Sequence, residues 1–389
     1  MENKERALAH VEKIEWIRSI EGADNIELIG VLGWVCIAKR GEFNIGDMAV
    51  YIEIDSKCPE TDERFAFLAN KKFKVKTMKL GKFKVISQGL ALPLSLFPEL
   101  QDRNIGDDVT EALKITYASE EDTARKTNKV DPNAKYKSMA KRRPKLFANP
   151  IVRRIMRYSI GRKIMFLLFG RKKDNPKKFP DWIVKTDETR IENAPFYLQS
   201  TEKWIKTEKC DGTSCTFAVD RLKKGKNKFD FIVCSRNVRQ ADREQACYHE
   251  SNIYWELADK YDIEKILTQF ATENNYNRVV LQGEGVGSVQ GNPYKFMENK
   301  LFVFNLIIDG TRLGTVEMAD FCKSHGLTSV PIIDTAYELP KTMEEMKLEA
   351  DGYSELNPKV KREGFVYRDI SGQKSFKNVS REYLLKHNG

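Results

Sequence analysis

The sequence has no long run of apolar residues, few histidines and few cysteines. Its longest apolar run, residues 164–169, has six residues, whereas a membrane-spanning helix needs about 18. Residues 1–6 are rich in charge and no apolar stretch follows them, so we expect no secretory signal. The four histidines and seven cysteines include no C-x-x-C pair, which disfavours a Cys/His zinc site. Because an odd number of cysteines without close pairing is typical of reducing compartments, we expect an intracellular and cytoplasmic protein.

The positive charge of the chain is concentrated in one segment. The 389 residues carry a formal net charge of +10, and residues 135–178 contain sixteen lysines or arginines and one acid, Asp174. That segment therefore has a net charge of +15, and the rest of the chain has −5. A length of 389 residues predicts two or three domains, and 41% hydrophobic with 31% charged residues indicates a soluble globular protein.

The basic segment also has the pattern of an amphipathic helix. Apolar residues at positions 151, 152, 155 and 156 recur at helical spacing, and Arg153, Arg154 and Arg157 fall between them. Such a helix can pack its apolar side on a neighbouring domain, follow the phosphate backbone of a nucleic acid, or lie on an anionic membrane. The pattern favours the membrane least and does not decide between the other two.

Turn residues and short apolar runs divide the chain into three regions. In residues 1–118, short β-branched and aromatic runs alternate with glycine-containing turns, which predicts an OB-like β-barrel, although an SH3-like barrel has the same pattern. Residues 119–180 are expected to form a linker that carries the basic helical insertion. Residues 181–389 alternate strand-like runs with a helix, which predicts an α+β domain built on antiparallel sheets. The expected strands are residues 26–32, 34–38, 48–54, 73–78, 83–86, 214–219, 229–234, 278–282, 301–308 and 364–367, and the expected helix is residues 253–270.

Four short segments in the last two hundred residues place reactive groups beside turn residues at strand ends, where rigid scaffolds present functional groups. Each alone is weak evidence, since K-x-D-G is also an ordinary surface turn. Together they put one lysine among carboxylates and further lysines, and a lysine is nucleophilic only when it is neutral. The carboxylates can hold a divalent metal directly or through water, and the later lysines can neutralise a triphosphate. This combination predicts phosphate chemistry through a lysine adduct. The segments are Lys209-Cys210-Asp211-Gly212, Ser235-Arg236-Asn237, Gly283-Glu284-Gly285 and Glu363-Gly364 with Lys374 and Lys377.

The order of these segments resembles the covalent nucleotidyltransferases, a superfamily of RNA ligases, DNA ligases and mRNA capping enzymes. Residues 185–193, 289–295 and 375–380 are similar to RNA ligases in particular. The N-terminal region, with Gly33-Trp34, Gly46-Asp47 and residues 51–55, resembles the OB domain that precedes the catalytic domain in one branch of RNA ligases. DNA ligases and capping enzymes usually carry an OB domain after the catalytic domain, and only 12 residues follow Lys377, so they are the less favoured alternatives. A non-catalytic RNA-binding protein with a relic site is another.

The resemblance implies an ATP-dependent RNA ligase that seals 5′-phosphate and 3′-hydroxyl ends in RNA repair, with RNA and ATP as partners and no obligate protein partner. It implies an OB-like barrel followed by a nucleotidyltransferase domain, and a lysyl-AMP intermediate on Lys209. Phe304 would stack on adenine. The implied catalytic residues are Lys209, Lys374, Lys377 and Arg236; the nucleotide contacts are Glu208, Lys209, Gly212, Arg236, Glu284, Phe304, Lys374 and Lys377; and the ligands of Mg²⁺ or Mn²⁺ are Asp211, Glu284 and Glu363.

Overall fold

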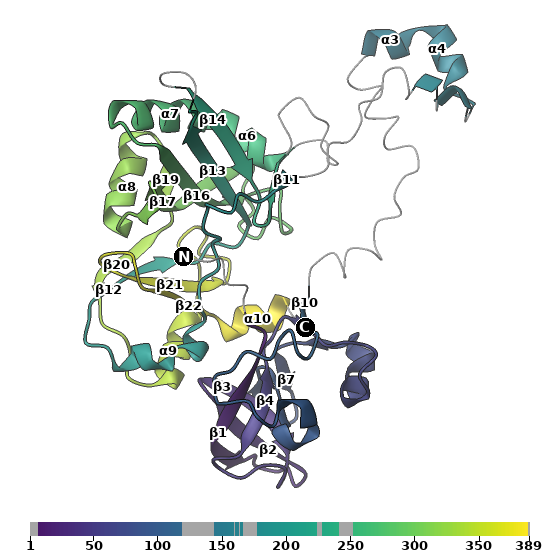
Figure 1. The fold of residues 1–389 in the computed structure, drawn as a ribbon, viewed down its shortest axis with the longest axis vertical. Helices are drawn as coiled ribbons and strands as arrows, with labels where there is room; N and C mark the ends of the chain where they lie inside the picture. The colour runs from purple at the N-terminus through teal and green to yellow at the C-terminus, as the bar shows by residue number, and fades with distance from the viewer. Residues whose placement is uncertain are drawn as a thin grey trace.

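The computed structural model describes residues 7–118, 144–158, 160–162, 164–165, 177–223, 228–240 and 252–387. Figure 1 shows a β-rich N-terminal part, in purple and blue, below a larger part in green and yellow that contains both sheets and helices. This is the order of parts that the sequence predicts. None of the helices among the described residues is long and apolar enough to cross a membrane.

The N-terminal part is built on a five-stranded antiparallel sheet with the strand order β3-β2-β1-β4-β9. Side chains of its fourth strand alternate between two apolar clusters, as a pleated strand buried on both faces requires. Val50 and Ile52 belong to one cluster, and Ala49 and Tyr51 to the other. The strands are β1 (Ala9–Ser19), β2 (Ile26–Val31), β3 (Trp34–Lys39), β4 (Met48–Ile52) and β9 (Leu90–Pro93).

The sequence missed β1, β9 and two short strands of this part and misjudged two others. The pairing of β1 with β2 shifts register between Ile14 and Trp16, and such a bulge breaks the alternation by which a strand is detected. The expected strands at 73–78 and 83–86 are shorter because Phe73 and Lys84 have positive φ angles of 59° and 55°, which strands do not allow. The short strands found here are β5 (Ser56–Lys57), β6 (Lys74–Val75), β7 (Met78–Leu80), β8 (Val85–Ser87) and β10 (Thr116–Tyr117).

The C-terminal part contains an eight-stranded sheet whose main path runs β11-β15-β14-β13-β16-β17-β18, with β19 beside β17. Three helices cover one face of it (Figure 1), where Leu257, Leu267 and Met318 of the helices pack with Phe217 and Leu281 of the sheet. Four of the expected strands are present as β13, β14, β16 and β17. The elements are β11 (Lys177–Lys178), β13 (Thr213–Arg221), β14 (Phe229–Cys234), β15 (Val238–Arg239), α6 (Ile253–Lys260), α7 (Ile263–Glu273), β16 (Arg278–Val286), β17 (Lys300–Ile308), β18 (Thr311–Arg312), α8 (Thr315–Ser324) and β19 (Thr328–Ser329).

The expected single helix at residues 253–270 is two helices, α6 and α7. Asp262 lies between them in the left-handed conformation, with φ 49° and ψ 35°, and a right-handed helix cannot pass through such a residue. Because Leu257 and Leu267 on the two sides of the break enter the same apolar cluster, the apolar spacing alone did not reveal the interruption.

A second, four-stranded sheet with the order β20-β12-β21-β22 completes the C-terminal part. Its core contains Trp204, Tyr367 and Phe376 together with Met346 of the helix α9. The strands β12 and β13 follow each other in sequence but belong to different sheets, and residues 209–212 alone connect them. The lysine motif is therefore the link between the two sheets. The elements are β12 (Trp204–Glu208), β20 (Ile332–Tyr337), α9 (Met343–Ala350), β21 (Gly364–Asp369), β22 (Ser375–Val379) and α10 (Arg381–His387).

The N-terminal sheet packs directly against the C-terminal part. The Gly33 amide donates a hydrogen bond of 2.9 Å to the Glu192 carbonyl, and Arg190 forms an ion pair of 3.0 Å with Asp55. Leu384 of α10 is buried in the apolar cluster of the N-terminal sheet, and Figure 1 shows α10 between the two parts. The C-terminal helix thus joins the OB-like sheet to the strands that carry the lysine motif.

The described part of the basic insertion is mostly helical. The helices α3 (Pro144–Ala148) and α4 (Pro150–Ile155) lie within it, and residues 160–162 and 164–165 are also helical. Figure 1 shows α3 and α4 projecting away from both parts of the protein. The rest of residues 135–178, apart from 156–158 and 177–178, lies outside the described residues.

Candidate active site

Lys209 lies where the two sheets of the C-terminal part meet. The strand β12 pairs with β21 so that Glu208 faces Phe365, and the Lys209 amide donates a hydrogen bond of 3.0 Å to the Gly364 carbonyl. This register brings Glu363, at the start of β21, beside Lys209, and the Lys209 Nζ to Glu363 Oε1 distance is 2.8 Å. The two side chains are 27% and 15% exposed, so the amine is enclosed but still reachable from solvent.

The second carboxylate of the site comes from the large sheet. Pairing of β13 with β16 places Glu284 opposite Ser214, five residues after the lysine. The turn that carries Lys209 approaches β16 so closely that a Cβ atom at Gly212 would collide with the Gly285 carbonyl. Gly212 therefore allows the lysine turn to lie against the strand that presents Glu284, which is a structural role beside its implied nucleotide contact.

Asp211 is held by two tyrosines from distant parts of the chain. Its amide donates a hydrogen bond of 2.7 Å to the Tyr294 hydroxyl, and its carboxylate shares a hydrogen bond with the Tyr383 hydroxyl. Tyr383 lies on α10 and packs against the apolar cluster of the N-terminal sheet. The position of the Asp211 carboxylate is therefore tied to the seating of α10 on the OB-like sheet.

The carboxylates around Lys209 keep its amine protonated. Burial is the largest influence and favours the neutral amine, but Glu363, Glu284 and Asp211 together outweigh it and raise the pKa of Lys209. Burial likewise raises the pKa of Glu284 to about 8, against the opposing effect of Lys209, and Glu363 and Asp211 add to the rise. Three acidic side chains thus crowd one ammonium group, and the raised pKa of Glu284 shows that the site lacks positive charge. Further positive charge would favour both the ionised Glu284 and the neutral, nucleophilic lysine.

This excess of negative charge fits a divalent cation. Among the described residues, no group of three or more His, Cys, Asp or Glu side chains is close enough to hold an ion directly. Asp211, Glu284 and Glu363 instead surround the Lys209 amine, where they can accept hydrogen bonds from the waters of a hydrated Mg²⁺ or Mn²⁺, as magnesium sites often do.

Two of the predicted phosphate contacts meet at one acid. Lys377 Nζ lies 2.7 Å from Asp187 Oδ1, and Arg236 Nη2 lies 3.3 Å from Asp187 Oδ2. The Lys377 side chain is 10% exposed and the Arg236 side chain is 48% exposed. Asp187 therefore acts as an internal counter-anion that holds two cationic groups together. The sequence resemblance included residue 187 but assigned it no role.

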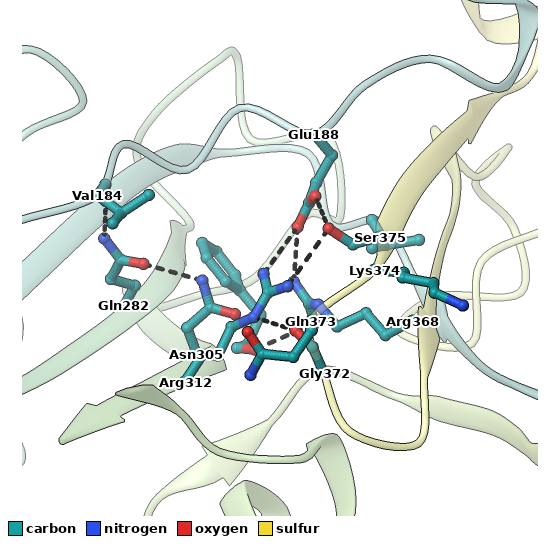
Figure 2. A network of polar contacts seen from close by, with 12 residues as sticks. Val184, Glu188, Gln282, Asn305, Arg312, Arg368, Gly372, Gln373, Lys374 and Ser375 are labelled. Carbon is teal, nitrogen blue, oxygen red and sulfur yellow. Dashed lines mark hydrogen bonds and ion pairs between the residues drawn. The ribbon is translucent and has the colours of Figure 1, made fainter. Parts of the chain in front are cut away.

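A buried network of ion pairs, shown in Figure 2, holds β22, the strand that carries Lys377. Glu188 pairs with Arg368 at 3.0 Å and with Arg312 at 3.7 Å, and it accepts a hydrogen bond from Ser375. Burial would raise the pKa of the Glu188 carboxyl, but its partners, Arg368 first, outweigh burial and lower it. Arg368 also donates a hydrogen bond of 3.1 Å to the Phe304 carbonyl. The network thus joins β17, β18, β21 and β22.

The structure does not bring Lys374 to the site. Its Nζ forms an ion pair of 2.7 Å with Glu202, and both side chains are about half exposed; Figure 2 shows it pointing away from the network. Side chains alternate along a strand, so Ser375 and Lys377 share one face of β22, toward Glu188 and Asp187. Lys374 precedes β22 and its side chain turns to Glu202. The structure therefore does not bring Lys374 together with the other predicted contacts, and Ser375 occupies the position two residues before Lys377.

Phe304 and Glu208 flank the lysine in different ways. Phe304 is partly buried and packs with the cluster that includes Cys210, a position that suits stacking on a bound base. Burial raises the pKa of the Cys210 thiol well above its ordinary value, which leaves it unreactive. The Glu208 carboxylate is buried and accepts hydrogen bonds from Ser354 and from the Glu355 amide. The Glu208 carboxylate thus holds the segment around Ser354 against β12.

Sequence reasoning missed the residues that hold the predicted ones in place. The sequence shows two adjacent acids at residues 187 and 188. Their basic partners lie far along the chain, and residue spacing does not reveal such pairs. All six cysteines in the described residues are buried free thiols. The missed residues are Asp187, Glu188, Tyr294, Arg312, Arg368 and Tyr383.

Comparisons with known proteins match both parts of the chain. An RNA ligase family model matches residues 202–385, and an OB-fold domain model matches residues 8–94. The second match confirms an OB-fold at the N-terminus, in place of the SH3-like alternative. No curated protein sequence matches the chain.

Solved structures of an RNA ligase from Naegleria gruberi resemble the whole chain. A mutant of that ligase with ATP and Mn is 30% identical, and the match covers 98% of this chain and 99% of that chain with a TM-score of 0.74. The same ligase with PPi gives 30% identity, the same coverage and a TM-score of 0.75. Another mutant, with AMP and Mn, gives 30% identity, the same coverage and a TM-score of 0.74. These matches confirm the predicted fold class, an OB-fold followed by an α+β domain.

Proposed function

The chain belongs to the RNA ligase family, and we propose that it joins a 5′-phosphate to a 3′-hydroxyl in RNA with ATP, through AMP held covalently on Lys209. The observation that carries this proposal is the position of Lys209: an enclosed amine, 2.8 Å from Glu363, at the junction of two sheets. The three acidic side chains around Lys209 support the proposal further, because a lysine with only a structural role does not need three acidic partners.

In the first step, the neutral amine of Lys209 attacks the α-phosphorus of ATP. The new bond joins Nζ to phosphorus, the bond from phosphorus to the bridging oxygen breaks, and pyrophosphate leaves. Glu363 is placed to accept the ammonium proton because its Oε1 already contacts Nζ. A divalent cation, when bound, supplies positive charge that offsets the carboxylates and the α-phosphate. Asp211, Glu284 and Glu363 are the residues that would hold it, through its waters.

Lys377, Arg236 and Phe304 are placed to bind the nucleotide. Lys377 and Arg236 are preassembled on Asp187, and phosphate oxygens can replace that carboxylate as their partner without a large rearrangement. Such prearranged cations stabilise the charge that develops on a phosphate during transfer. Phe304, beside Cys210, offers an aromatic face for adenine.

Two further transfers complete the reaction. AMP passes from Lys209 to the 5′-phosphate of an RNA end, which restores the amine, and the 3′-hydroxyl of the other end attacks that phosphate and releases AMP. The Nζ–phosphorus bond formed in the first step breaks in the second, so the enzyme returns to its starting state. We propose RNA repair as the role because broken RNA with these ends is the substrate that the chemistry requires.

The proposal is tested with radiolabelled nucleotides and a panel of nicked duplexes. The wild-type protein should acquire a covalent label from α-labelled ATP with Mg²⁺ or Mn²⁺, and none from GTP. It should then seal a nick with RNA on the 3′-hydroxyl side better than the all-DNA nick. A label from GTP would indicate a capping enzyme, preferential sealing of DNA a DNA ligase, and no label at all a binding protein.

A further inference from the structure

The basic insertion leaves an apolar surface uncovered. Figure 1 shows α3 and α4 away from both parts of the protein, and none of the α4 residues is buried. The two short helices pack against each other. In this structure neither part of the protein therefore covers the apolar side of α4.

Five large apolar side chains are exposed within this short stretch. Ile151 is 68% exposed, Ile155 38%, Tyr158 66%, Ile160 70% and Ile164 49%. Exposed apolar side chains elsewhere in the described chain occur singly along the sequence, which is ordinary for a protein surface. A concentration of this kind marks a surface that binds something apolar.

The same stretch is strongly basic. Arg153, Arg154, Arg157 and Arg162 alternate with the exposed apolar residues, and the sequence contains no acid between residues 135 and 173. Arginines of this kind suit any polyanion, so charge alone does not distinguish a nucleic acid from an anionic lipid surface. The apolar residues do distinguish them. Contacts with phosphates along a nucleic acid leave isoleucines in water, whereas the boundary between lipid headgroups and acyl chains buries them while the arginines contact the headgroups.

We propose that the described residues 144–158, 160–162 and 164–165 form an interfacial anchor for an anionic lipid bilayer, separate from the catalytic site. The apolar side chains enter the headgroup boundary and the arginines pair with lipid phosphates and carboxylates. The anchor lies on the membrane and does not span it. This assignment goes beyond RNA ligation, since no residue of the anchor is among those that surround Lys209.

The experiment uses the full-length protein, its variants and vesicles of two compositions. One set of vesicles is phosphatidylcholine alone, and the other contains about one part in three phosphatidylserine. An apolar variant carries Ile151→Ser, Ile155→Ser and Ile160→Ser, and a charge variant carries Arg153→Gln, Arg154→Gln and Arg157→Gln. The control variant carries Ile45→Ser and Ile105→Ser, two residues of the OB-fold that are 67% and 54% exposed. Labelling of Lys209 by ATP checks that each variant is folded.

We expect the wild type and the control to co-sediment with the phosphatidylserine vesicles and not with phosphatidylcholine alone. The charge variant should bind those vesicles about a hundredfold more weakly, because each arginine near an anionic surface contributes about fivefold in affinity and three are removed. The apolar variant should bind at least about tenfold more weakly. Affinity for RNA, measured in parallel, should be unchanged in the apolar variant.

The apolar variant decides the outcome. Vesicle binding equal to that of the wild type would overturn the proposal, as would a wild-type protein that does not bind anionic vesicles. A second result would also overturn it: only the charge variant is impaired, and the impairment is in RNA affinity and its salt dependence. The segment would then follow a nucleic acid, and the membrane assignment would be wrong. Loss of vesicle binding in both variants, with the control intact, supports the anchor whether or not the arginines also affect RNA.

Discussion

Glu284→Gln is expected to stabilise the metal-free protein at alkaline pH while it removes most of the adenylation activity. Burial raises the pKa of Glu284 to about 8 in the folded protein, from an ordinary value of 4.5. Between these two pH values the unfolded chain has lost the proton and the folded chain still holds it. The contribution of Glu284 to folding stability is therefore fully present below pH 4.5 and is lost progressively as the pH rises toward about 8. Glutamine has no proton to lose and removes this dependence.

The size of the effect follows from the same interval. One pH unit is equivalent to about 1.4 kcal/mol for a single group, which gives an upper limit of about 5 kcal/mol across the interval. The side chain of Glu284 is only partly buried, and solvent screening reduces the expected gain to about 2 kcal/mol. Activity should nevertheless fall by orders of magnitude, because charge that assists phosphoryl transfer typically contributes several kcal/mol.

The assay is urea unfolding of both proteins in the presence of a chelator, at several pH values across this interval. The difference in unfolding free energy should be near zero at the acidic end and should grow in favour of the variant toward the alkaline end. Glu111→Gln, at an exposed glutamate of the N-terminal part, is the matched control for the substitution itself. Parallel pH dependences of wild type and Glu284→Gln would refute the account of the electrostatics around Lys209.

The remaining predictions concern the groups that position the nucleotide and the metal. Lys377→Ala should slow adenylation about a hundredfold or more, whereas Lys374→Ala should leave the rate within about twofold, since Lys374 contacts only surface groups; single-turnover labelling with ATP measures both. Tyr383→Phe keeps the aromatic packing and removes the hydrogen bond to Asp211, so the Mg²⁺ concentration for half-maximal adenylation should rise about fivefold, and an unchanged metal dependence would contradict the coupling to α10. Arg368→Lys cannot serve Glu188 and the Phe304 carbonyl together, and KM for ATP should rise about tenfold; an unchanged KM would argue against a positioning role of the network.

The sequence was sufficient to find residues that the structure brings together around Lys209 but not the partners that hold them. Lys209, Glu284 and Glu363 stand beside glycines at strand ends, and this local chemistry is visible in the sequence. The register of β12 against β21 and of β13 against β16 then brings them together. Asp187 could not be found in this way, because it meets Lys377 only when two segments 190 residues apart become neighbours.

Local backbone conformation explains most of the differences from the sequence prediction. Lys374 lies in the turn before β22, where it pairs with Glu202, whereas Lys377 lies within the strand, and the sequence did not locate this strand. The break at Asp262 depends on a left-handed backbone conformation, and residue type did not reveal it. The bulge in β1 likewise hid a strand whose alternation is otherwise regular.

The most direct test of the central claim is identification of the adenylated residue. Wild-type protein is incubated with ATP and Mg²⁺, digested, and analysed by mass spectrometry for a peptide that carries AMP. The account predicts AMP on Lys209 alone, with no adduct in Lys209→Ala or in Lys209→Arg, whose guanidinium stays protonated, although both variants remain folded. An adduct that persists in either variant, or that maps to another lysine such as Lys206 or Lys377, would contradict it.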